Sequence, residues 1–95
     1  PGSLGIVACG NAQGVCIVAN KVRGVRAVTG FSEYAAESSR ADDNANVLCL
    51  PGRTLTTEEA KAITKKWLET EFSQAERHKR RLEKVAEIEE AEFGV

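Results

Sequence analysis

A cysteine beside a glycine-rich loop is the group in this chain best placed to do chemistry. The segment Cys9 to Gly14 (CGNAQG) follows a short apolar run that predicts a buried strand. Ligands of parallel α/β sheets bind beyond the carboxyl ends of the strands, where loop amides can stabilise an anion or a developing oxyanion. These amides favour a thiolate, so Cys9 could act as a base or nucleophile. A free cysteine is as often simply buried, and both interpretations stay open.

A basic segment at the head of the last predicted helix is the second candidate. Arg77 and Arg81 are four residues apart, so their guanidinium groups share one helix face and could hold one phosphate. Such runs are more often solvated helix faces, and glutamates surround this one. Arg53 follows the third predicted strand and is a further anion contact. His78 points about 100° away from Arg77 and is expected at the surface.

The elements that must position these residues alternate between strand and helix. Leu4 to Cys9, Val25 to Thr29 and Val47 to Leu50 read as strands. Helices are expected over Val15 to Val22, from the Ser32 cap to about Arg40, and after capping boxes that begin at Thr56 and Ser73, with a polar loop over Ala41 to Asn46. Cys16, Cys49 and Trp67 are expected in the core.

This order predicts an α/β fold with a parallel sheet, since each parallel crossover needs a helix to return the chain. The 95 residues are expected to form a single domain. A sheet of three strands leaves a long edge open. We therefore expect either a missing N-terminal part or oligomerisation.

Composition excludes several classes of protein. Thirteen Lys and Arg against fourteen Asp and Glu give a net charge of −1, so neither nucleic acid nor an anionic membrane is an expected partner. Glycines interrupt the uncharged stretch from Pro1 to Asn20, and no basic region of a signal peptide begins the chain. Three cysteines without a C-x-x-C pair and one histidine predict free thiols, no metal and a cytoplasmic location. Residues 1–3 could be a cloning remnant.

Six segments together resemble the C-terminal part of the ribose-5-phosphate isomerase B family, which includes the galactose-6-phosphate isomerase subunits. In order they are CGNAQG, VCIVANKV, RGVRAV, DDNANVLCLPGR, WLETEF and RHKRR, and the similarity runs from about Leu4 to Val85. The resemblance implies a Rossmann-like, three-layer α/β/α subunit that lacks its N-terminal half. It also implies a homodimer or tetramer with the active site at the subunit interface, and cofactor-free aldose–ketose isomerisation of sugar phosphates.

The resemblance also implies roles for individual residues. Cys9 matches the base that moves a proton between C1 and C2 of the sugar. The loop that stabilises the enediolate matches Gly10, Asn11, Ala12, Gln13 and Gly14. Asn11 stands where the family usually has threonine or serine, and Ala12 where it usually has glycine. The phosphate-binding arginines match Arg53, Arg77 and Arg81.

Asp42 and Asp43 stand where the family has a His-Asn pair, whose histidine helps to open the sugar ring. Asp42 is therefore a candidate base and Asp43 a candidate substrate contact. A tetrose 4-phosphate cannot close a furanose ring because its O4 is esterified, so an enzyme acting on one would not need that histidine. Ribose 5-phosphate and a tetrose phosphate are both substrate candidates.

Two other functions remain open. The chain could be a non-catalytic phosphosugar-binding or assembly subunit, in which Asn11, Ala12, Asp42 and Asp43 record lost chemistry. Alternatively, Cys9 could be a redox-sensing thiol.

Overall fold

Three parallel strands form the centre of the protein. The computed structural model describes residues 2–93. Strands β1 (Gly5–Cys9), β2 (Ala27–Thr29) and β3 (Val47–Pro51) lie in the order β1-β3-β2. In register, Gly5 pairs with Val47 and Cys9 with Pro51, so the carboxyl ends of the strands form one rim. The predicted parallel α/β sheet is confirmed.

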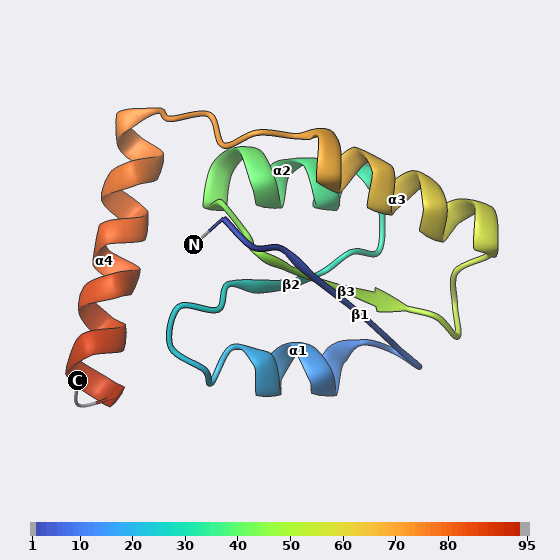
Figure 1. The fold of residues 1–95 in the computed structure, drawn as a ribbon, viewed down its shortest axis with the longest axis horizontal. Coiled ribbons are helices and arrows are strands. Elements are labelled where there is room, and N and C mark those ends of the chain that lie inside the picture. The colour runs from blue at the N-terminus through green and yellow to red at the C-terminus, as the bar shows by residue number, and fades with distance from the viewer. Residues whose placement is uncertain (1, 94–95) are drawn as a thin grey trace.

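Helices cover both faces of this sheet. Helix α1 (Gln13–Ala19) lies on one face, and helices α2 (Glu33–Asp43) and α3 (Thr57–Glu69) lie on the other (Figure 1). Helix α4 (Glu76–Phe93) stands beside the amino ends of the strands (Figure 1). The architecture is the expected three-layer α/β/α arrangement. No helix within residues 2–93 has both the length and the apolar composition needed to cross a membrane.

The central strand β3 is buried because helices pack against it from both sides. On one side, Leu48 and Leu50 pack with Ile63 and Trp67, and the Trp67 side chain is fully buried. On the other side, Cys49 packs with a second cluster that includes residues of α1. The predicted core positions of Trp67 and Cys49 are confirmed.

Strand β1 differs from its predicted environment. It lies at the edge of the sheet and pairs only with β3, so Leu4, Ile6 and Val7 are between 37% and 44% exposed. The expectation that this strand is buried was wrong for the described residues. An apolar run predicts a strand, but burial depends on neighbours that the run does not specify.

Helix α2 continues further than expected. Asp42 and Asp43, which were predicted in a loop, form its last turn, and the helix ends where Asn44 takes a left-handed conformation with φ 49°. Helix α1 is also displaced from its predicted position, since it begins at Gln13 and ends at Ala19. Polar residues favour both a loop and an exposed helix end, so the Asp pair did not distinguish the two.

One of the two predicted capping boxes forms. The Thr56 hydroxyl accepts a hydrogen bond from the Glu59 amide at 3.1 Å, and the Glu59 carboxylate accepts one from the Thr56 amide at 2.7 Å. At the second box, the Ser73 hydroxyl instead accepts from the Ala75 amide and contacts His78. Ser73 therefore contacts the His78 ring instead of forming a capping box with Glu76.

Candidate active site

Cys9 ends β1 and lies exposed on the carboxyl rim of the sheet. Its carbonyl accepts a hydrogen bond from the Gly52 amide at 2.8 Å, and the Gly10 carbonyl accepts one from the Arg53 amide at 2.9 Å. These two bonds join the loop after β1 to the turn after β3. The backbone of Cys9 is therefore held at a defined place on the rim, and the residue is exposed rather than buried.

The loop from Gly10 to Gly14 closes onto helix α1. Ala12 is fully buried and has φ 65°, a left-handed conformation that costs an alanine roughly 1 kcal/mol and that glycine adopts freely. The Asn11 side-chain oxygen accepts a hydrogen bond from the Gln13 amide at 3.0 Å. Asn11 therefore stabilises the loop internally by occupying one of its amide donors.

Arg53 lies against this loop. A methyl group built on Gly10 would lie 2.7 Å from one terminal nitrogen of the Arg53 guanidinium and 3.0 Å from Cζ. The structure thus brings together Cys9, the loop and one of the three predicted phosphate contacts. We call this set, Cys9, Gly10 to Gly14 and Arg53, the thiol half-site.

The remaining predicted residues lie near the amino ends of the strands, opposite the carboxyl rim. Asp42 and Asp43 end α2, just before β3 begins, and Arg81 and Asp43 line one groove of about 450 Å³ between α4 and the start of β2. Gly5 and Cys9 are separated by the length of β1, about 13 Å at the usual rise of a strand. We call Asp42, Asp43, Arg77 and Arg81 the arginine half-site; one chain does not bring it to the thiol half-site.

Arg77 and Arg81 are both exposed. The two ion pairs found among residues 2–93 join His78 to Asp42 and Lys79 to Glu76. Neither arginine of the half-site therefore has a carboxylate within 4.0 Å in the described part of the chain. This leaves both guanidinium groups available to an anion.

His78 was predicted at the surface, and this was wrong. It is only 5% exposed, its Nδ1 lies 2.6 Å from the Ser73 hydroxyl, and its Nε2 lies 3.6 Å from Asp42 Oδ1. Sequence reasoning missed this cluster because its members come from α2, α4 and the segment between α3 and α4. The one signal in the sequence was the helical offset of about 100° between Arg77 and His78, which puts the two side chains on different faces of the helix.

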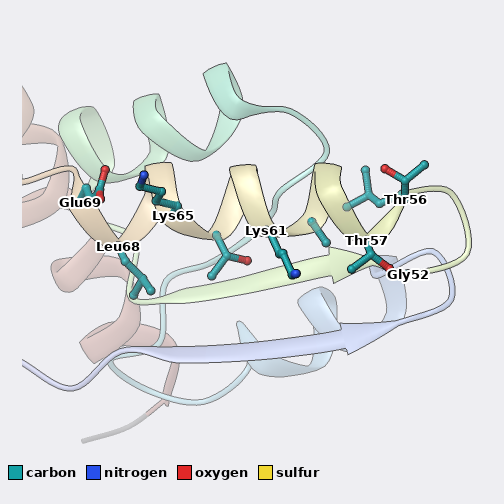
Figure 2. A pocket seen from close by; sticks show the side chains of 10 residues that line it. Gly52, Thr56, Thr57, Lys61, Lys65, Leu68 and Glu69 are labelled. Carbon is teal, nitrogen blue, oxygen red and sulfur yellow. The ribbon is translucent and has the colours of Figure 1, made fainter.

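The sequence also did not predict a groove that runs along α3. It has a volume of about 630 Å³ and runs from Gly52 and Thr56 to Leu68 and Glu69. Figure 2 shows Lys61 and Lys65 along its length and Gly52 at its end. Because the Gly52 amide binds the Cys9 carbonyl, this groove ends beside the thiol half-site.

The other two cysteines differ from Cys9. The Cys16 thiol donates a hydrogen bond to the Ala27 carbonyl at 3.4 Å. Burial, with a smaller contribution from Cys16, raises the pKa of the Cys49 thiol to about 11. Among residues 2–93 no three His, Cys, Asp or Glu side chains are grouped so as to hold a metal ion.

The parallel sheet and the loop at its carboxyl rim place the chain in the class of Rossmann-like α/β proteins. Residues 1–85 match the sequence model of a family described as Ribose/Galactose Isomerase. The chain belongs to this family. It is 43% identical over 89 residues to the ribose-5-phosphate isomerase B of Mycobacterium tuberculosis, covering 94% of this chain and 55% of that protein. It is 46% identical over 68 residues to a D-erythrulose-4-phosphate isomerase of Pectobacterium atrosepticum, covering 72% and 45%.

Solved structures agree with this assignment. The type B ribose 5-phosphate isomerase of Trypanosoma cruzi superposes with a TM-score of 0.93 at 42% identity, covering 95% of this chain and 59% of that one. The enzyme of Mycoplasma genitalium with bound ribulose-5-phosphate superposes with a TM-score of 0.88 at 45% identity, covering 92% and 57%. The chain therefore spans about half the length of the relatives it matches, between 45% and 59% in these four comparisons.

Proposed function

We propose that this chain supplies the catalytic residues of a cofactor-free aldose–ketose isomerase that acts on sugar phosphates in the cytoplasm. The observation that carries the proposal is the exposed Cys9 thiol on the carboxyl rim, with Arg53 packed against the adjoining Gly10. Membership of the ribose/galactose isomerase family supports the same chemistry.

In the proposed reaction the Cys9 thiolate removes the proton from C2 of the open-chain aldose. The electron pair moves toward the carbonyl oxygen at C1, which gives an enediolate. Amides of the loop from Gly10 to Gly14, other than the Gln13 amide that already donates to Asn11, stabilise the developing negative charge. Cys9 then returns the proton to C1, while the proton of the C2 hydroxyl passes to the oxygen on C1. The product is the ketose, with no net gain or loss of atoms or electrons.

A complete site on this proposal needs two chains. The thiol half-site lies at the carboxyl ends of the strands and the arginine half-site near their amino ends, and β1, which runs between these ends, is about 13 Å long. A homodimer or tetramer would place Arg77, Arg81 and Asp42 of one subunit opposite Cys9 and Arg53 of another. Both guanidinium groups are exposed and without a carboxylate partner among residues 2–93, which suits phosphate binding across an interface.

The substrate is either ribose 5-phosphate or a tetrose 4-phosphate. Asp42 occupies the position that the resemblance assigns to a ring-opening histidine, and a tetrose 4-phosphate needs no ring opening. Relatives of both kinds match this chain, a ribose-5-phosphate isomerase B and a D-erythrulose-4-phosphate isomerase. The preference for the four-carbon substrate therefore rests on Asp42. Asp42 would then act on the open-chain sugar, with Asp43 beside it.

The test is exchange of the C2 proton with solvent deuterium, measured with both substrates on the intact protein and on this chain with an N-terminal half added in trans. Cys9→Ala should abolish both exchange and net isomerisation, because the base is gone. Cys16→Ala is the matched control, since Cys16 bonds to the Ala27 carbonyl away from the rim. Full turnover by Cys9→Ala would show that another group is the base.

The same experiment separates the alternative functions. Phosphosugar binding without exchange in the wild-type protein would favour a binding or assembly subunit. Reversible oxidation of Cys9 without either binding or exchange would favour a redox-sensing thiol.

A further inference from the structure

We infer that His78 is a positioning residue, which holds helix α4 and Asp42 in a fixed relationship and so sets the geometry of the arginine half-site. This inference rests on the proposed function for the role of that half-site. It depends on a chain of three side chains, Ser73, His78 and Asp42, that ties α4 to the last turn of α2.

The direction of the hydrogen bonds follows from the donors present. Ser73 Oγ accepts the Ala75 amide hydrogen at 3.2 Å, which leaves its own hydroxyl hydrogen free to donate. It can donate to Nδ1 of His78, 2.6 Å away. When Nδ1 accepts this hydrogen bond, Nε2 carries the ring hydrogen and faces Asp42 Oδ1 at 3.6 Å. That distance is an electrostatic contact rather than a hydrogen bond.

Helix α4 packs against the rest of the protein through His78. His78 is the one residue of this helix that is buried, and its ring lies 6.3 Å from that of Phe72. Toward the far end of the helix, the Glu89 carboxylate accepts a hydrogen bond from the Gly24 amide at 2.8 Å. Arg77 precedes His78 directly and Arg81 lies less than one turn beyond it. The position of the His78 ring therefore determines where both guanidinium groups project.

The contact with His78 also gives Asp42 a partner other than arginine. Arg81 lines the same groove as the neighbouring Asp43, so a free carboxylate on this turn of α2 could pair with a guanidinium group. Such a pair would compete with phosphate for the arginine. Among residues 2–93 no carboxylate, that of Asp43 included, lies within 4.0 Å of Arg77 or Arg81.

The test uses the intact protein, with inorganic phosphate as the probe. In His78→Ala the contacts to Ser73 and to Asp42 are both lost. We therefore expect phosphate to bind about tenfold more weakly and KM for the sugar phosphate to rise by a similar factor. The value of kcat should change less than about threefold. His78→Gln should recover most of the affinity, because its amide oxygen can still accept the Ser73 hydroxyl hydrogen.

Ile63→Val is the control for general loss of stability, because it shortens a core side chain between the sheet and α3. It should lower the melting temperature without changing the affinity for phosphate. Unchanged phosphate affinity in His78→Ala, or an equal loss in Ile63→Val, would overturn the inference.

The outcome does not depend on turnover. If the wild-type protein binds phosphate but isomerises neither sugar, the proposed function fails, and weaker binding by His78→Ala still supports the positioning role. If the wild-type protein does not bind phosphate at all, the arginine half-site has no such ligand and the inference is wrong.

Discussion

The guanidinium of Arg53 occupies the space that a side chain at Gly10 would fill, with one nitrogen only 2.7 Å from the position of the missing methyl group. Arg53 follows β3 and Gly10 follows β1, so this contact depends on the parallel pairing of Cys9 with Pro51. It brings a positive charge against the residue that directly follows Cys9.

Gly10→Ala should therefore move the Arg53 side chain rather than disrupt the fold, because the end of a flexible side chain can shift. We expect kcat/KM for the sugar phosphate to fall about tenfold, which corresponds to roughly 1.4 kcal/mol. Gly5→Ala, at the start of β1, is the control, since its methyl group meets Val47 at an ordinary 3.6 Å. Equal kinetics for the two variants would show that Arg53 does not contact substrate.

The separation of the two half-sites predicts complementation between inactive subunits. Cys9→Ala and the double variant Arg77→Ala/Arg81→Ala should each be inactive alone. Unfolded together in equal amounts and refolded, they should recover roughly a quarter of the wild-type activity, because half of the dimers carry one intact site out of two. No recovery, with mixed dimers demonstrated by mass spectrometry, would mean that each site is built from one chain.

Asp42→His tests the basis of substrate choice. An imidazole can give a proton to the ring oxygen of a furanose, so turnover of ribose 5-phosphate should rise by about tenfold or more. Turnover of a tetrose 4-phosphate, which has no ring to open, should change much less. Asp42→Asn is the control, because it removes the charge without supplying an acid. A rise that also occurs with asparagine would trace the effect to charge alone.

The raised pKa of the Cys49 thiol predicts that the stability of the fold depends on pH. Burial raises the pKa of its thiol to about 11, whereas the unfolded chain ionises it near 9.0. The folded protein therefore favours the neutral thiol. This preference contributes its full free energy to folding below pH 9, and the contribution is lost as the pH rises toward 11. The loss should be about 2–3 kcal/mol, measured by urea unfolding at pH 8 and at pH 11.

Cys49→Ala is the control for this titration. It should be less stable at pH 8, because it leaves a small cavity, and should lose less stability between pH 8 and pH 11. An identical pH dependence in the two proteins would mean that other groups dominate the alkaline unfolding.

The candidate site was only partly predictable. Cys9, the loop after it and Arg53 follow the carboxyl ends of two parallel strands, and parallel strands bring those ends to one rim, so their proximity could be inferred from position along the chain. The His78 cluster could not be inferred in this way. Its three members are brought together by the packing of α4 against α2, and nothing local to Ser73, His78 or Asp42 specifies that contact.

The amino-acid sequence by itself determined the order of strands and helices, the parallel sheet and the core positions of Trp67 and Cys49, because hydrophobic periodicity and turn residues act locally. Only the tertiary structure decided that β1 is an exposed edge strand, that His78 is buried, and that α4, which carries Arg77 and Arg81, stands beside the amino ends of the strands (Figure 1). Cys9 lies at the carboxyl end of β1. These properties depend on which elements become neighbours, and that is set by the packing of the whole chain.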